Sequence, residues 1–309
     1  MENYKLRVIF DGGVNMKKVL VLGGTRFFGK RLVQKLIDRG FDVSIATRGI
    51  TKDSFGDKVN RLIIDRKNPE SLKQLSNQHW DIVYDNICYT PNEASEIIEV
   101  LTNHVEKFIF TSTLAVYDEG LNHIEEDFNP YTYPIKYDEL NEYTYGEGKR
   151  LSEAVLFQTA SFPVIAPRFP VVLGDDDYTK RLLFHVEKVA TKEEIVISDM
   201  GREMTFINSD ETAEFLYWLG ESKIENVGPI NACSNGVITF NEIVELCEEA
   251  TGEKAKISIE GPKASHSPFD AYSDRTLSNE KAKKEGFQFL DAHSWMKELI
   301  YQFSLEQRK

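Results

Sequence analysis

From Lys18 onward, short runs of β-branched and apolar residues alternate with segments whose apolar residues recur at helical spacing. This alternation is typical of βαβ units, in which helices join parallel strands. The first run, Val-Leu-Val-Leu at 19–22, is apolar on both faces, as a central strand between two helix layers must be. The expected strands are 19–22, 42–46, 61–64, 81–85, 107–111 and 164–168. The sequence therefore predicts an α/β fold with a doubly wound parallel sheet.

The segments between these runs have the periodicity of helices. Apolar residues at 28, 32, 33, 36 and 37 share one helical face, and Gly40 follows where a left-handed residue would end the helix. Pro91 is expected to open a second helix, and a third should run from about 141 to 160. Six such strand and helix repeats by about residue 170 have the size of one nucleotide-binding domain of the Rossmann type.

The pattern divides the chain into three regions. Residues 1–15 have no strong periodicity and are expected to be an N-terminal extension. Residues 16–170 are expected to form the nucleotide-binding domain. Residues 171–309 should form a smaller α/β substrate domain that is partly interleaved with the first, with a strand at 194–198 and helices at about 179–190, 209–220 and 240–251, followed by two C-terminal helices.

Composition excludes several classes of protein and partner. The 309 residues are 41% hydrophobic and 28% charged, which is ordinary for a soluble globular protein. A net charge of −13 repels phosphate backbones, so no nucleic-acid partner is expected. The sequence has neither an apolar stretch of the ~18–20 residues that span a bilayer nor a secretory leader, which favours a cytoplasmic location without membrane contact. The three cysteines form no metal-binding or disulfide pattern, and no metal site is expected.

A glycine-rich motif, Leu-Gly-Gly-Thr-Arg-Phe-Phe-Gly at 22–29, lies where the first strand ends and the first helix begins. Glycines at such a junction allow a tight turn and a close approach to a pyrophosphate, which the helix N-terminus attracts. Arg26 replaces the middle glycine of the usual pattern, and its guanidinium can hold an anion with two hydrogen bonds. Cofactor contacts are expected from Gly23, Thr25, Arg26, Phe27, Phe28 and Gly29.

Two further positions bear on the choice of dinucleotide. The second strand ends in Ala-Thr-Arg-Gly at 46–49, without the acid that reads a ribose 2′-hydroxyl. Arg48 would instead accept a 2′-phosphate, which favours NADP and leaves NAD open. Asp65 and Arg66 close the third strand, where a carboxylate could accept a hydrogen bond from the adenine amino group.

Tyr145 and Lys149 form a Tyr-x-x-x-Lys pair within the third expected helix. Residues four apart share a helix face, so the ammonium can lower the pKa of the phenol and allow it to act as an acid or base. Thr111, Ser112 and Thr113 lie at the tip of the fifth strand. Because ligands bind over the carboxyl ends of such strands, these hydroxyls and the pair should converge on one crevice.

Together these motifs resemble the short-chain dehydrogenase/reductase superfamily, in its extended or atypical branch of NAD(P)-dependent epimerases and dehydratases, over about residues 17–303. The glycine-rich motif is similar to the GGTRFxG variant of that branch. The stretch 110–117 resembles its SSxxxVY segment, and 145–149 matches its YGxxK pair. The resemblance implies catalytic roles for Thr113, Tyr145 and Lys149. It also implies cofactor contacts from Asn86, Cys88 and Lys149, and a substrate contact from Arg168.

The resemblance implies hydride transfer at a hydroxyl or keto carbon by an NAD(P)-dependent epimerase or reductase, with a nucleotide sugar as one candidate substrate. Leu114 and Ala115 stand where 4,6-dehydratases have an Asp-Glu pair, so dehydratase chemistry is not expected. The alternative is a regulatory or RNA-binding protein that binds NAD(P) without catalysis, as in chloroplast relatives of the GGTRF group. Homodimers are common in the superfamily, and a homodimer is compatible with the sequence.

Overall fold

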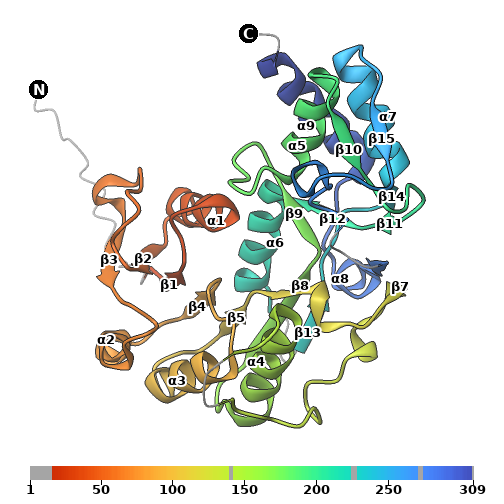
Figure 1. Ribbon diagram of the computed structural model, residues 1–309. Helices are drawn as coiled ribbons and strands as arrows, with labels where there is room; N and C mark the ends of the chain where they lie inside the picture. The colour runs from red at the N-terminus through yellow and green to blue at the C-terminus, as the bar shows by residue number, and fades with distance from the viewer. Residues whose placement is uncertain (1–15, 139–141, 224–227, 271–273, 308–309) are drawn as a thin grey trace, which may run out of the picture.

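The computed structural model describes residues 16–138, 142–223, 228–270 and 274–307 (Figure 1). The expected N-terminal extension, 1–15, lies outside these residues. The main sheet is parallel and has the order β13-β8-β5-β4-β1-β2-β3, with β6 pairing the end of β8. Its strands are β1 (Lys18–Leu22), β2 (Asp42–Thr47), β3 (Asn60–Ile63), β4 (Ile82–Asp85), β5 (Phe108–Phe110), β6 (Ser112–Thr113), β8 (Val164–Phe169) and β13 (Gly228–Asn231). The prediction of a doubly wound parallel sheet is confirmed, and the six expected strands are present within two residues of their predicted bounds.

Helices cover both faces of this sheet. On one face α1 (Phe27–Asp38) packs beside α6 (Ser209–Glu221), and on the other α3 (Pro91–Leu101) packs beside α4 (Tyr145–Thr159). The strand β1 explains why: Val19 and Val21 enter the core under α1 and α6, whereas Leu20 and Leu22 enter the core under α3 and α4. All four side chains are fully buried, so this strand requires a helix layer on each side.

The C-terminal half adds elements to the main sheet and also forms a second group of helices and small sheets. β13 and α6 return to the sheet, while α5 (Arg181–Ala190), α7 (Phe240–Thr251) and α9 (Ala292–Gln307) pack around a separate apolar core (Figure 1). Two-stranded sheets join β9 (Val171–Leu173) to β12 (Phe206–Asn208) and β10 (Glu194–Val196) to β15 (Lys256–Ser258). A third small sheet contains β14 (Ile238–Thr239), β11 (Glu203–Met204), β16 (Arg275–Leu277) and β7 (Gly120–His123), and α8 (Glu280–Lys284) follows β16.

One connection and one strand differ from the prediction. Between β2 and β3 the structure has only a short 3₁₀ turn, Gly56–Lys58, so the second of the six expected repeats lacks its helix. The strand β13 was not predicted because it is short and contains Pro229, and a proline usually argues against a strand. It is tolerated at the edge of the sheet, where β8 is the one described strand that pairs with β13. Among the described helices, none is long and apolar enough to span a membrane.

Candidate active site

The glycine-rich loop brings the N-terminus of α1 close to the end of β1. Gly23 has φ +83, a conformation that side chains other than glycine rarely adopt. A Cβ on Gly29 would lie 2.5 Å from the carbonyl oxygen of Gly23, so the first turn of the helix can pack on the loop only if residue 29 is glycine. Arg26 precedes the helix and its side chain makes no capping hydrogen bond. The N–H groups of the first turn are therefore suited to an anion such as a phosphate.

A cavity of about 230 Å³ adjoins this loop. Phe27, Phe28, Asn86 and Lys149, four of the expected cofactor residues, line it. The Oδ1 atom of Asn86 accepts a 2.7 Å hydrogen bond from the hydroxyl of Thr111, but its buried Nδ2 has no partner among the described residues. A buried donor without an acceptor costs roughly 1–3 kcal/mol. A polar ligand in this cavity would supply the missing acceptor.

Lys149 is held inside the site by main-chain carbonyls. It is 2% exposed, and its Nζ donates 2.7 Å hydrogen bonds to the carbonyl oxygens of Cys88 and Thr111. The ring centroids of Tyr89 and Phe110 lie 4.8 and 4.5 Å from the same nitrogen. Because an ammonium has three hydrogens, one remains for a ligand or for a neighbouring hydroxyl. Cys88 contributes its carbonyl, while its buried thiol lines neither cavity.

The pKa of Lys149 gives a testable dependence of stability on pH. Burial lowers this pKa from 10.5 to about 8. Between these values the unfolded chain binds a proton that the folded chain has released, so folding becomes more favourable as pH rises. We expect the stability of the native chain relative to Lys149→Met to increase by about 3 kcal/mol between pH 7.5 and 10.5. Urea unfolding of both proteins measures this difference, and a difference that does not change with pH would contradict it.

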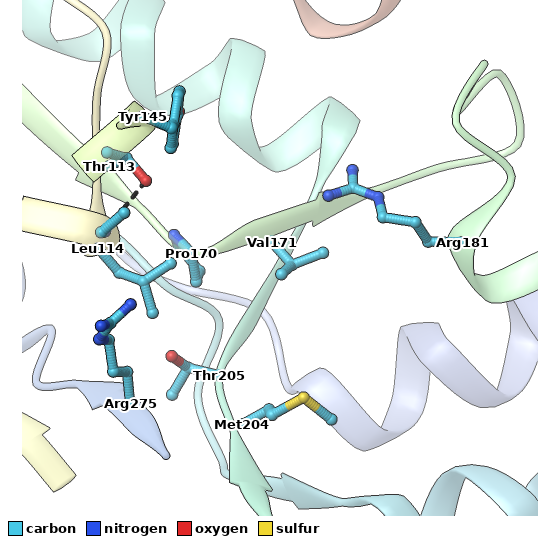
Figure 2. A pocket seen from close by; sticks show the side chains of 10 residues that line it. Thr113, Leu114, Tyr145, Pro170, Val171, Arg181, Met204, Thr205 and Arg275 are labelled. Atoms are coloured by element: carbon cyan, nitrogen blue, oxygen red, sulfur yellow. Dashed lines mark hydrogen bonds between the residues drawn. The ribbon is translucent and has the colours of Figure 1, made fainter. Parts of the chain in front are cut away.

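A second cavity, of about 200 Å³ (Figure 2), shares part of its lining with the first. Both cavities are lined by Thr113, Tyr145, Pro170 and Arg181, so Thr113 and Tyr145 lie where the cavities meet. Tyr145 begins α4 and is 55% exposed. The Oγ1 atom of Thr113 accepts a 3.2 Å hydrogen bond from the N–H of Ala115, so the hydroxyl hydrogen is directed elsewhere. The structure thus brings the expected catalytic threonine, tyrosine and lysine to adjoining cavities.

The structure places Arg168 away from both cavities. It is fully buried, and its guanidinium forms an ion pair with the equally buried Glu153, at 2.6 Å between Nη2 and Oε2. Its Nε donates a 3.0 Å hydrogen bond to the same carboxylate, and its other hydrogen bonds go to the hydroxyl of Tyr117 and to the carbonyl oxygens of Glu125 and Phe128. All of its nitrogens therefore have partners inside the protein. The geometry gives Arg168 a structural part instead of the substrate contact that the motif implied.

The remaining expected cofactor residues differ in their exposure. Arg66 turns inward, where it pairs with the buried carboxylate of Asp85 and donates a 3.2 Å hydrogen bond to the carbonyl oxygen of Glu93. Asp65 and Arg48 are exposed at the ends of β3 and β2. Gly23, Thr25, Arg26 and Gly29 form the loop and helix start without lining either cavity.

The lining residues that were not predicted include Tyr89, Tyr178, Arg181 and Arg275. The Tyr178 ring lies 6.3 Å from that of Phe27, and the Arg26 guanidinium lies 6.0 Å from its centroid. Tyr178 belongs to the loop that follows β9, and loops after parallel strands commonly carry ligand contacts. Its position after a strand was the one feature of the sequence that could have predicted a ligand contact from Tyr178. None of the predicted motifs includes Arg275, and the sequence had no signal for it.

Comparisons with known proteins agree with this architecture. Residues 19–96 match the model of the NAD dependent epimerase/dehydratase family. The chloroplast stem-loop binding protein of 41 kDa b of Arabidopsis thaliana is 26% identical, covering 90% of this chain and 71% of that protein. UDP-glucuronic acid decarboxylase 1 of Arabidopsis thaliana is 25% identical, covering 90% of this chain and 68% of that protein.

Solved structures of epimerases have the same fold. The UDP-glucuronic acid 4-epimerase of Bacillus cereus superimposes with a TM-score of 0.73 at 17% identity, over 94% of this chain and 99% of that one. The UDP-glucose 4-epimerase of Thermus thermophilus gives 0.68 at 19% identity, over 94% and 99%. The predicted resemblance to NAD(P)-dependent epimerases and dehydratases is thus confirmed: residues 19–96 match the NAD dependent epimerase/dehydratase family, and the described fold is that of these epimerases. The GGTRFxG subgroup stays a prediction.

Proposed function

We propose that this protein is an NAD(P)-dependent enzyme of the short-chain dehydrogenase type that acts as an epimerase or reductase on a nucleotide sugar. One observation carries the proposal: Thr113 and Tyr145 line both cavities at their junction, and Lys149 lines the cavity on the side of the glycine-rich loop. A dinucleotide on that side and a sugar on the other would both meet the two hydroxyls.

The first cavity and its loop suit a nicotinamide dinucleotide. The open N–H groups of α1 and Arg26 would hold the pyrophosphate, and the unpartnered Nδ2 of Asn86 would donate to the ligand. The third hydrogen of the Lys149 ammonium would be donated to the nicotinamide ribose, and the carboxylate of Asp65 would accept a hydrogen bond from the adenine amino group. A bound nicotinamide supplies the acceptor or donor of a hydride.

Side chains of the protein would carry out the proton transfer. Tyr145 would take the proton of the substrate hydroxyl, and the ammonium of Lys149 would stabilise the phenolate and so lower the pKa of the phenol. Thr113 would donate its hydroxyl hydrogen to the substrate oxygen, since its oxygen already accepts from Ala115. Leu114 and Ala115, beside it, have apolar side chains and cannot supply the acidic group that would eliminate water from the sugar. This set of groups supports oxidation and reduction at one carbon.

Arg48 tests the preference for NADP that forms part of the proposal. Its exposed guanidinium at the end of β2 would pair with a 2′-phosphate, and such charge-assisted bonds are strong. We expect Arg48→Ala to weaken NADPH binding roughly 10-fold while NADH binding changes less than 2-fold. Fluorescence titration of both reduced dinucleotides measures this. Equal losses for the two would argue against recognition of a 2′-phosphate, and no binding of either would overturn the proposed function.

The same proposal extends to the organisation of the chain. Residues 16–170 would bind the dinucleotide, and residues 171–309 would shape the sugar cavity while lending β13 and α6 to the main sheet. A cytoplasmic location and a homodimer complete the proposal. Light scattering tests the dimer, with a monomer at micromolar concentration as the contrary result.

RNA binding without catalysis is the second candidate. The similarity to the chloroplast stem-loop binding protein over 90% of this chain favours it, whereas the net charge of −13 opposes it. Contacts to phosphates would make RNA affinity fall steeply with salt. Titration with a stem-loop RNA at 50 and 200 mM salt separates the candidates, because only the second predicts such binding.

A further inference from the structure

The cavity beside Thr113 and Tyr145 has an unusual charge distribution (Figure 2). Its walls include the apolar residues Leu114, Ala115, Pro170, Val171 and Met204. Arg181 and Arg275 also line it, and none of the ten described residues around it is acidic. A small cavity with two cations and no acid favours an anionic ligand, even in a protein whose net charge is strongly negative.

Arg275 is fixed relative to the segment that carries Thr113. It lies in β16, opposite Gly120 of β7, and its Nε donates a 3.1 Å hydrogen bond to the carbonyl oxygen of Asp118. Both contacts fall within seven residues after Thr113. Figure 2 shows Arg275 on the same side of the cavity as Thr113 and Leu114, with Arg181 on the opposite side.

The end of the Arg275 side chain is available for a ligand. Within the described part of the chain, no residue accepts a hydrogen bond from its two terminal nitrogens. Arg181 is more committed: its Nη2 donates to the carbonyl oxygen of Val172 at 2.9 Å, and its Nε lies 3.4 Å from a carboxylate oxygen of Asp177. The planar fork of an arginine matches a carboxylate with two parallel hydrogen bonds. Arg275 is therefore the residue of the cavity best suited to a carboxylate.

The size of the cavity limits where that anion can lie on the substrate. About 200 Å³ is less than the roughly 300 Å³ at which most ligand pockets begin, so the cavity suits one sugar ring and excludes a whole nucleotide sugar. The same ring must reach Thr113 and Tyr145. Resting on the proposed function, we propose that the sugar ring that is oxidised or reduced carries a carboxylate, and that Arg275 binds this carboxylate. The substrate class is then a nucleotide-linked uronic acid.

The test compares an acidic and a neutral sugar on protein loaded with NAD⁺. Calorimetric titration is expected to show that UDP-glucuronate binds at least 10-fold more tightly than UDP-glucose. Arg275→Gln should weaken UDP-glucuronate roughly 10- to 100-fold and change UDP-glucose less than 2-fold. Arg275→Lys should recover part of the loss, because it keeps the charge without the fork. Arg39→Gln, which removes the same charge at the exposed end of α1, should change neither affinity.

Two results would overturn the inference. One is equal binding of UDP-glucuronate and UDP-glucose by the native protein. The other is an equal loss of affinity for both sugars in Arg275→Gln, which would mean that Arg275 contacts the diphosphate that the two share. Binding of neither nucleotide sugar would instead count against the proposed function. Saturation-transfer NMR with free glucuronate and its methyl ester then decides the inference. A signal for the acid alone that is lost in Arg275→Gln supports it, and equal signals for acid and ester contradict it.

Discussion

Tyr145→Phe is expected to lower kcat by about 1,000-fold and to leave the Kd for NADH within 2-fold of the native value. The substitution removes only the hydroxyl that is proposed to move the substrate proton. Because Tyr145 is 55% exposed and begins its helix, the fold should not depend on that hydroxyl. Rates come from chromatographic measurement of the sugar product, because an epimerase regenerates its own nicotinamide in every turnover, and the Kd comes from fluorescence titration.

A matched control separates this effect from a general loss of tyrosine hydroxyls. Tyr137 is also 55% exposed, and its hydroxyl lies 2.8 Å from that of Ser95, away from both cavities. Tyr137→Phe should leave kcat within 2-fold. A kcat for Tyr145→Phe within 10-fold of the native value would show that another group moves the proton.

Arg168→Met is expected to destabilise the protein by about 4 kcal/mol. Arg168 and Glu153 are both fully buried, so removal of the arginine leaves a buried carboxylate without its partner. The carbonyl oxygens of Glu125 and Phe128 lose their donor as well. Urea unfolding measures the loss, and replacing Arg168 and Glu153 together with apolar residues should cost less than the single change.

An exposed ion pair serves as the control for the buried pair of Arg168 and Glu153. Lys297 and Glu249 are 58% and 62% exposed, so Lys297→Met should cost about 1 kcal/mol or less. If Arg168 contacted substrate instead, Arg168→Met would raise KM and leave the unfolding midpoint nearly unchanged. That pair of results would contradict the structural part assigned to this residue.

The elements with strong local signals could be predicted from the sequence. The strand β1 is apolar at every position that faces a helix layer, and it was found within one residue of its predicted bounds. The helix α7 matches its predicted bounds, 240–251, because Thr239 and Glu242 form a capping box before it and Gly252 ends it in a left-handed conformation. In such segments local preference and tertiary packing favour the same structure.

The parts that depend on distant segments could not be predicted. The strand β13 is short and exists because β8 offers it a free edge. The inward turn of Arg168 depends on Glu153, which a helix brings beside it. Arg275 reaches the cavity through the pairing of β16 with β7, about 155 residues away in sequence. The Tyr145 and Lys149 pair was visible because both residues lie on one helix.

The central claim is that Tyr145 serves hydride transfer between a dinucleotide and a sugar at the junction of the two cavities. The most direct measurement is a rapid-mixing single turnover, in which UDP-glucuronate or UDP-glucose meets native or Tyr145→Phe protein loaded with NAD(P)⁺. Absorbance at 340 nm records reduced nicotinamide, including any that forms only transiently. Reduced nicotinamide is expected to form in the native protein and to form at least 100-fold more slowly in the variant. Equal rates in the two proteins would contradict this claim, and so would the formation of neither reduced nicotinamide nor an altered sugar from either substrate.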